Sequence, residues 1–140
     1  MMADVHTREQ RSLNMSRIRS RDTKPEVRLR SLLHKAGYRF RLHASELPGR
    51  PDIVMPKHRA VIFVNGCFWH RHEGCRFTTT PATRAEFWQK KFDGTIKRDE
   101  RNCDLLEKSG WRVIIIWECD LKAFPERTLG EITKQLRKPH

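Results

Sequence analysis

Four residues of the kinds that bind transition metals stand between positions 67 and 119 of the chain. Three follow a C-x4-H-x2-C spacing and the fourth comes much later: Cys67, His72, Cys75 and Cys119. Zinc takes four sulfur or nitrogen ligands in a tetrahedron, and two separate groups of ligands can enclose it. Paired C-x2-C motifs are missing. The pattern therefore supports two readings equally: a structural Zn²⁺ site, or four cysteines of the chain, Cys103 included, that have no connection with one another. Cys103 lies in a helical pattern and is expected to be a surface or half-buried thiol.

A second group of residues suits Mg²⁺. Asp52 begins one predicted strand, the next strand ends near Val64, and His70 follows shortly after. Mg²⁺ keeps several waters and needs only one or two protein oxygens besides phosphate, so adjacent strand ends can hold it. An imidazole nearby can activate or orient water. On the residues alone, a turn or cap role explains Asp52 more simply, and His70 and His72 can exchange roles.

Two large aromatic residues, Phe68 and Trp69, lie among these ligands in a polar turn. Nothing obvious in the sequence buries them. Apolar side chains of this kind can insert between DNA bases, most easily where base pairing is already weak. Core packing is the alternative, and it is the better explanation for Trp111 and Trp117.

The elements that must position these groups alternate in type. Capping-box patterns begin two helices, at Thr23 and at Thr83, and Gly94 is expected to bend or break the second. The predicted order is a helix ending at Gly37, strands at 38–42, 51–55 and 60–64, a helix pair at 83–92 and 96–108, a strand at 111–117 and a helix at 125–137. This order predicts an α/β domain with a mixed central sheet between helical layers.

The charge of the chain points to a polyanionic partner. The 140 residues carry a formal net charge of +12, which suits one nucleic-acid-binding domain better than an acidic membrane surface. Residues 1–22 form a basic, polar segment with Arg17 and Arg19, expected to be a DNA-contacting arm or else a solvated tail. Residues 23–140 form the single folded domain. A signal peptide and a twenty-residue apolar span are absent from the sequence, which predicts a soluble cytoplasmic protein without disulfides.

Several motifs resemble one known family. LPGRPDIVM, VIFVNGCFWHRHEGC, PATRAEFWQKK and GWRVIIIWEC, in this order, are similar to the very short patch repair (Vsr) mismatch endonucleases. The resemblance implies a restriction-endonuclease-like fold and a monomeric bacterial enzyme that acts at the nucleoid. It further implies a strand-specific nick beside the thymine of T·G mismatches left by deamination of 5-methylcytosine, with mismatch-repair proteins as possible partners.

The resemblance also assigns residues. Asp52 matches the Mg²⁺-binding carboxylate and His70 the catalytic histidine, while Glu26 and Asp99 match outer acidic positions. Without the resemblance, Glu26 is explained as a capping-box partner and Asp99 as a solvated helix carboxylate. The structural zinc ligands it implies are Cys67, His72, Cys75 and Cys119. The aromatic residues that it implies insert at the mismatch are Phe68, Trp69 and Trp88.

Two departures from the family pattern affect this assignment. Members of the family can carry Thr and His where this chain has Val64 and Asn65. Val64 has no side-chain ligand, so a Mg²⁺ contact there must use its main-chain carbonyl, and Asn65 cannot titrate. The loop also holds an extra residue at Glu73-Gly74, before Cys75. The alternatives to mismatch nicking are a nuclease for another DNA structure and a zinc-stabilised DNA-binding module without activity.

Overall fold

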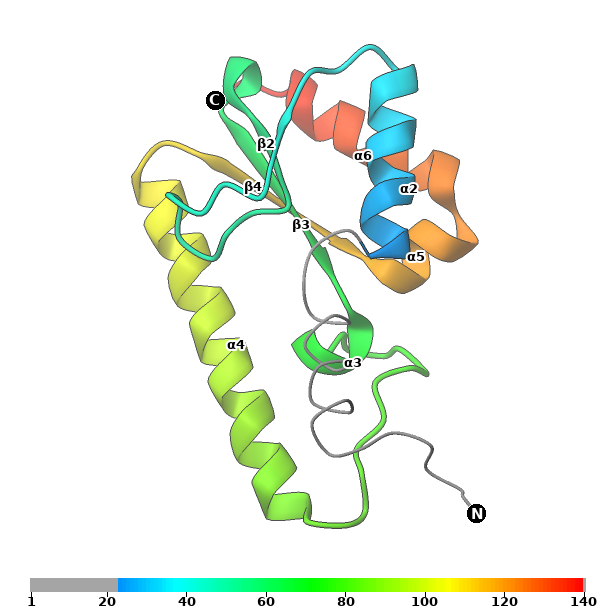
Figure 1. The fold of residues 1–140 in the computed structure, drawn as a ribbon, viewed down its shortest axis with the longest axis vertical. Helices are drawn as coiled ribbons and strands as arrows, with labels where there is room; N and C mark the ends of the chain where they lie inside the picture. The colour runs from blue at the N-terminus through cyan, green and yellow to red at the C-terminus, as the bar shows by residue number, and fades with distance from the viewer. Residues whose placement is uncertain (1–22, 140) are drawn as a thin grey trace, which may run out of the picture.

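A mixed four-stranded sheet with helices on both faces forms the centre of the computed structural model (Figure 1). The structure describes residues 23–139, so the predicted arm at 1–22, with Arg17 and Arg19, lies outside the described residues. The predicted α/β class with a mixed sheet between helical layers is confirmed. No helix of the described part is long and apolar enough to span a membrane.

The sheet has two kinds of neighbouring strands. Its order is β1 (Arg41–Leu42), β2 (Ile53–Met55), β3 (Ala60–Asn65) and β4 (Arg112–Trp117). The first two pairings are antiparallel, and β3 and β4 are parallel. A parallel pair needs a long crossover, which contains α4 (Ala85–Lys108). As a result, β3 and β4 both end at the same edge of the sheet.

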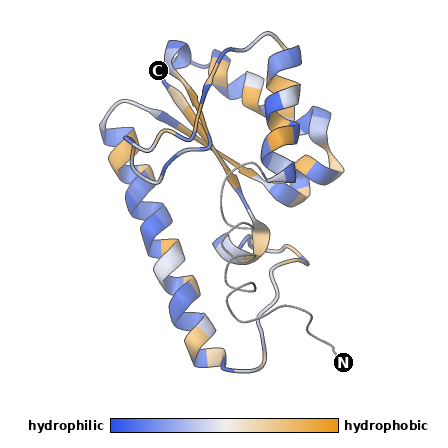
Figure 2. Ribbon diagram, viewed as in Figure 1, coloured by the Kyte–Doolittle hydropathy of each residue, from blue (hydrophilic) through white to orange (hydrophobic). Residues whose placement is uncertain are grey.

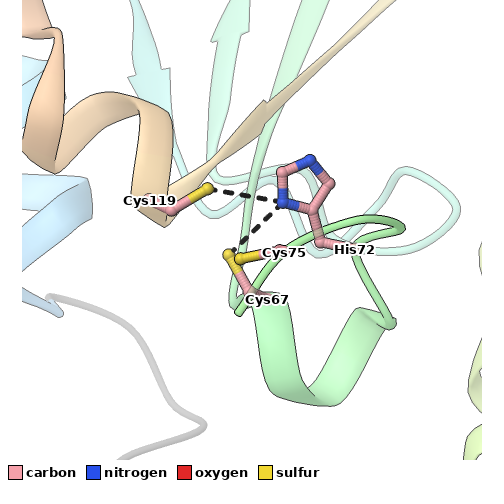
Figure 3. Close-up of side chains that lie close together, drawn as sticks. All are labelled: Cys67, His72, Cys75 and Cys119. Atoms are coloured by element: carbon pink, nitrogen blue, oxygen red, sulfur yellow. Dashed lines mark hydrogen bonds between the residues drawn. The ribbon is translucent and has the colours of Figure 1, made fainter. Parts of the chain in front are cut away.

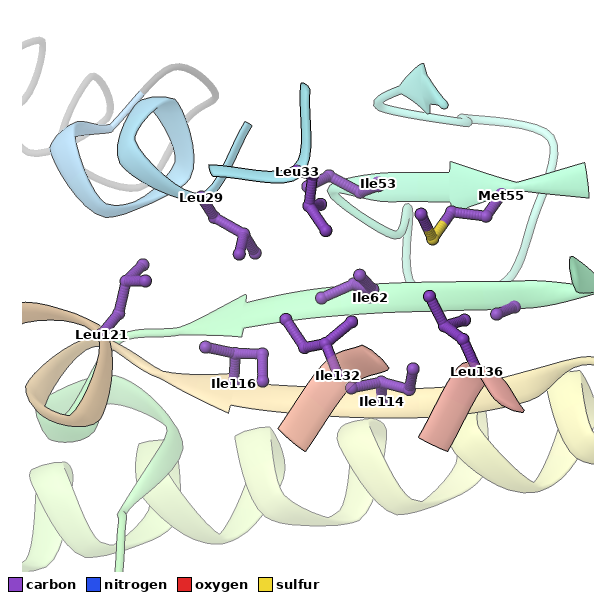
Figure 4. Packing of buried hydrophobic residues seen from close by; sticks show 11 residues of the cluster. Leu29, Leu33, Ile53, Met55, Ile62, Ile114, Ile116, Leu121, Ile132 and Leu136 are labelled. Atoms are coloured by element: carbon purple, nitrogen blue, oxygen red, sulfur yellow. The ribbon is translucent and has the colours of Figure 1, made fainter. Parts of the chain in front are cut away.

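One face of the sheet carries the main core. α2 (Lys24–Lys35), α5 (Glu118–Ala123) and α6 (Pro125–Arg137) cover it and contact one another. Leu29 and Leu33 lie one helical turn apart and therefore face the strands together. Fully burying such a side chain stabilises the fold by about 1.5–3 kcal/mol. The cluster shown in Figure 4 consists of Leu29, Leu33, Ile53, Met55, Ala60, Ile62, Ile114, Ile116, Leu121, Ile132 and Leu136.

The opposite face is covered less completely. Near its C-terminal end α4 packs Leu106 against Val54 and Val61, and further up the helix Phe92 is buried. Figure 2 shows α4 as a mostly polar helix with scattered apolar residues, in contrast to the apolar strands. The partial cover leaves space between α4 and the end of the sheet, and the candidate site lies there.

Four expectations about these elements were wrong. α4 is continuous through Gly94, because one helical glycine costs only about 1 kcal/mol and the buried residues on either side offset it. The capping box predicted at Thr83 is absent, since α4 begins after Arg84 in a left-handed conformation without a side-chain cap. The strands predicted at 38–42 and 51–55 shorten to Arg41–Leu42 and Ile53–Met55.

Candidate active site and metal centre

The shared edge of β3 and β4 leads into two short helices. α3 (Cys67–His70) follows β3 through Gly66, and α5 follows β4 directly. The carboxylate of Glu118 in α5 accepts a hydrogen bond from the Cys67 N–H at 3.1 Å. Arg71, in a left-handed conformation, ends α3, and its guanidinium donates to the carbonyl oxygens of Phe68 and Thr79. These contacts fix the turn that carries the metal-binding and aromatic residues.

The predicted zinc ligands come together in space. Their donor atoms all lie within 4.8 Å of one another: Cys67, His72, Cys75 and Cys119. His72 Nδ1 lies 3.6 Å from the Cys67 sulfur and 3.4 Å from the Cys119 sulfur (Figure 3). Cys119 lies in α5, just past the strand end where it was expected. Three thiols and an imidazole are a donor set that fits tetrahedral Zn²⁺.

His72, and not His70, lies with the cysteines, and two further contacts hold it there. Its ring stacks on Trp117 at 4.2 Å between centroids with 9° between the planes. The Thr78 hydroxyl donates to the His72 carbonyl at 2.7 Å. Cys103 stands apart on α4, as expected, and all four cysteines are free of disulfides.

The thiols differ in acidity. Burial raises the pKa of Cys67 to about 12. The main-chain N–H of Phe77 lowers the pKa of Cys75 to about 7. Metal coordination deprotonates a thiol, so loading of this cluster would release protons, and Cys67 in particular would depend on the cation for its charge.

Asp52 directly precedes β2, and its carboxylate is held by the neighbouring strand β3. Its Oδ2 accepts a hydrogen bond of 2.6 Å from the Val64 main-chain N–H near the end of β3. Burial nevertheless raises the pKa of Asp52 to about 7, and the neighbouring charge of Glu26 acts in the same direction. A divalent cation beside the carboxylate would favour its charged form and oppose this shift. A turn or cap role does not explain a half-buried carboxylate in this environment.

His70 pairs with the carboxylate of Asp99 on α4. His70 Nδ1 and Asp99 Oδ2 are 2.6 Å apart, and both side chains are about one-third exposed, at 30% and 33%. An ionised carboxylate can only accept, so the His70 Nδ1 carries a proton, and in the neutral imidazole Nε2 is then the acceptor. Asp99 is therefore a partner of His70 and not a solvated helix carboxylate.

Glu26 does more than cap its helix. Thr23 accepts the Glu26 N–H at 3.5 Å, but the Glu26 carboxylate lies 3.2 Å from Arg30 and 3.7 Å from His43. His43 was missed in the sequence, where it is a single polar residue after a short strand. The signal that reveals it is the β1–β2 register, which places His43 opposite Asp52 with a main-chain hydrogen bond of 3.2 Å.

These groups line one cleft of about 910 Å³ between α4 and the sheet edge. The cleft brings together Glu26, His43, Asp52, His70 and Asp99, with the main chain of Val64. Phe63 and Ile115 contribute apolar surface, and Lys90, Lys91 and Arg98 contribute positive charge. Thus the residues predicted for catalysis share one site, and the cysteine cluster is separate from it.

The aromatic residues form a cluster between α3 and the start of α4. Phe68, Trp69 and Trp88 are half-buried and pack on one another at centroid distances of 5.0–6.1 Å. Phe92, which the sequence analysis did not single out as part of this group, lies beneath them at 5.3 Å from Phe68 and 5.8 Å from Trp88. Trp69 also lines the cleft. Phe68 and Trp69, which nothing in the sequence buries, are therefore partly covered by each other and by Trp88.

Comparison with known proteins agrees with this arrangement. A family model described as DNA mismatch endonuclease Vsr matches residues 3–76. DNA mismatch endonuclease Vsr of Escherichia coli is 47% identical over 96% of this chain and 86% of that protein. Type II nicking enzyme V.XorIIP of Xanthomonas oryzae pv. oryzae is 46% identical over 97% of this chain and 96% of that protein.

The chain belongs to the Vsr family.

Membership makes the protein a DNA endonuclease of the nicking type, which hydrolyses phosphodiester bonds, and it removes the alternative of a non-catalytic DNA-binding module. Type II nicking enzyme V.NmeAIP of Neisseria meningitidis is also similar, with 38% identity over 97% of this chain and 98% of that protein. The relatives are bacterial and share DNA as the substrate class. The family implies metal-dependent catalysis, and the cysteine cluster of this Vsr chain fits a zinc site.

Proposed function

We propose that this Vsr-family chain is a Mg²⁺-dependent endonuclease that nicks one strand beside the thymine of T·G mismatches arising from 5-methylcytosine deamination. The observation that carries the proposal is the shared cleft: the Asp52 carboxylate, the His70–Asp99 pair and the edge of Trp69 open onto the same space. The name of the Escherichia coli relative supports a mismatch as the substrate.

Asp52 and the main-chain carbonyl of Val64 would hold the cation. When bound, Mg²⁺ neutralises charge on the phosphate and lowers the pKa of a coordinated water. The protein orients the Asp52 carboxylate through the Val64 N–H, at 2.6 Å. His70 presents Nε2 as the acceptor for a proton of the attacking water, or orients that water, because Asp99 occupies Nδ1. Glu26 stands behind Asp52 as an outer carboxylate.

Mismatch recognition falls to the aromatic cluster. Phe68, Trp69 and Trp88 would insert into the base stack where the T·G pair is weakest. Their mutual packing preorganises the rings, and Lys91, whose Nζ lies 5.8 Å from the centroid of the Trp69 ring, lines the same cleft. Lys90 and Arg98 add charge along the cleft. The arm at residues 1–22, with Arg17 and Arg19, would supply further contacts to phosphates, independent of base sequence.

The cysteine cluster would hold a structural Zn²⁺. It joins the loop after α3 to α5 and so fixes α3, which carries Trp69 and His70. The folded unit would be the domain at 23–140, acting as a monomer on DNA at the bacterial nucleoid, with mismatch-repair proteins as possible partners.

The decisive experiment compares two duplexes that differ at one base. Strand nicking is measured on otherwise identical duplexes carrying T·G or T·A, each with and without Mg²⁺. We expect a nick beside the mismatched thymine only with T·G and Mg²⁺. Equal nicking of both duplexes would contradict mismatch specificity, and nicking without any divalent cation would contradict the assignment of Asp52.

A second candidate is strand nicking at another DNA structure. The names of several relatives, including the one from Xanthomonas oryzae, describe type II nicking enzymes and mention no mismatch. Efficient nicking of a T·A duplex at a defined sequence would favour this alternative.

A further inference from the structure

Three side chains at the Asp52 end of the cleft lie close enough to share a cation. Donor atoms of Glu26, His43 and Asp52 all lie within 4.8 Å of one another. The three residues come from separate parts of the fold: Glu26 from α2, His43 from the segment after β1 and Asp52 from the segment before β2. Two carboxylates and an imidazole form a suitable three-ligand set for a divalent transition metal. A cation bound by this set would be a second one that shares the Asp52 carboxylate with the cation proposed above.

Arg30 already occupies the atoms that this second cation would need. Its Nη2 lies 3.2 Å from Glu26 Oε2 and 3.0 Å from His43 Nε2. A guanidinium group has donors only, so His43 must present the lone pair of Nε2 to it. A neutral imidazole has one such lone pair, and it cannot bind a metal and accept from Arg30 together.

The fold and the charge both favour this arrangement. Arg30 follows Glu26 by four residues on α2, so the helix itself keeps the two side chains adjacent. The side chains of Arg30 and Glu26 are only 18% and 7% exposed, so solvent screens the guanidinium charge weakly. Arginine stays charged under all ordinary conditions and would repel a divalent cation at the same position.

We propose that Arg30 is a positioning residue that prevents Glu26 and His43 from ligating a second divalent cation. The two side chains then remain paired with Arg30 beside the Asp52 carboxylate, and direct cation binding is confined to Asp52 and its strand neighbour. This inference rests on the proposed function in one respect, which is that Asp52 is the cation ligand.

Replacement of Arg30 by methionine tests the proposal without DNA. Arg30→Met removes the charge and the donors but keeps the length of the side chain and its helix-forming tendency. We expect the zinc-loaded variant to bind one more Mn²⁺ per chain than the wild-type protein, measured by calorimetry and by electron paramagnetic resonance. The additional ion should show coupling to an imidazole nitrogen.

Three further variants control the measurement. Arg30→Lys keeps the positive charge and should gain no ion. Arg28→Met changes an exposed arginine of the same helix and should also leave the count unchanged. The double variant Arg30→Met/His43→Ala should lose the additional ion together with its nitrogen coupling. Arg30→Ala serves in place of Arg30→Met if methionine disturbs folding, which circular dichroism and urea unfolding monitor.

The same Mn²⁺ count in wild-type and folded Arg30→Met protein would overturn the proposal. So would an additional ion that persists in the double variant. Because the count is made without DNA, it is independent of the T·G nicking assay: a failure of mismatch specificity leaves the Arg30 result standing, and the reverse also holds.

Discussion

The cysteine cluster and the Asp52 cleft both include residues of α3 but are built in opposite ways. In the cluster, residues 67–75 supply three of the four donors and α5 closes the set with Cys119. In the cleft, the carboxylates and imidazoles come from five parts of the fold: α2, the segment after β1, the residue before β2, α3 and α4.

This difference separates a structural site from a chemical one. Four protein donors complete a tetrahedron and leave no position for a substrate, as in structural zinc sites. The cleft leaves Asp52 with one short hydrogen bond, an elevated pKa and open space beside it. α3 connects the two, since Cys67 begins it and His70 ends it. Variants that reduce nicking and spare zinc binding, or the reverse, therefore test whether the two sites are separate.

The largest effect should come from Asp52→Ala. This variant removes the charged ligand proposed for Mg²⁺, and a bound cation supplies several kcal/mol of transition-state stabilisation, so nicking should fall by about 10³-fold or more. Single-turnover nicking of the T·G duplex measures the loss, while zinc content stays at the wild-type level. Asp104→Ala, at an exposed position of α4, is the matched control and should be fully active. Near-normal nicking by Asp52→Ala would refute the site.

His70→Ala should reduce nicking by roughly 10²–10⁴-fold, the usual contribution of a general base. The zinc content should not change, because His72 and not His70 lies with the cysteines. Asp99→Asn should show a smaller loss, since the amide can still contact His70 but holds the proton on Nδ1 less firmly. Loss of zinc from His70→Ala would show that the two histidines have exchanged roles.

Cys119→Ser should affect the other region. It removes one of four zinc ligands, so zinc per chain should fall below the wild-type value of about one, and stability should fall by several kcal/mol, because metal binding energy at such a site is partly folding energy. Metal analysis and urea unfolding measure the two changes. Cys103→Ser is the matched control and should alter neither. The opposite pattern would mean that the ligand set is wrong.

The same contrast explains what the sequence could and could not predict. The cysteine cluster is mostly local, so its spacing in the chain was enough to find Cys67, His72 and Cys75. The pairing of His70 with Asp99 joins residues 29 positions apart, and only the packing of α4 brings them together. His43 became visible only through the β1–β2 register, which two short strands do not reveal in advance. α4 continues through Gly94 because Phe92 and Leu106 are buried on either side of it. The low helix propensity of glycine gives no information about that burial, so the sequence predicted a bend or break.

The pH dependence of stability should distinguish the cleft from an ordinary surface. Burial raises the pKa of Asp52 from 3.8 to about 7, so between these values the folded protein holds a proton that the unfolded chain has released. Without Mg²⁺, the Asp52 contribution to stability is therefore present at low pH, declines as the pH rises towards 7 and levels off above it.

Asp52→Asn removes this contribution because the amide oxygen can still accept from Val64 but never becomes charged. Relative to the wild-type protein, the variant should gain roughly 1–4 kcal/mol of stability between pH 5 and pH 8. Urea unfolding at both pH values measures the gain, and comparison at equal pH cancels any effect of the zinc site. Asp93→Asn, at an exposed position of α4, should show no such gain. A constant difference between wild type and Asp52→Asn would contradict the raised pKa.

The smallest effect should be on recognition, which we assign to the aromatic cluster beside the cleft. Trp69→Ala and Trp88→Ala each remove one stacking surface, worth roughly 1–3 kcal/mol, so the preference for T·G over T·A should weaken by about ten- to a hundredfold. The remaining rings still pack on Phe92, so the fold and zinc content should be retained. Phe124→Ala changes an exposed aromatic residue between α5 and α6, away from the cleft, and should leave the preference unchanged. If the tryptophan variants lose activity equally on both duplexes, the cluster supports the structure of α3 and does not read the mismatch.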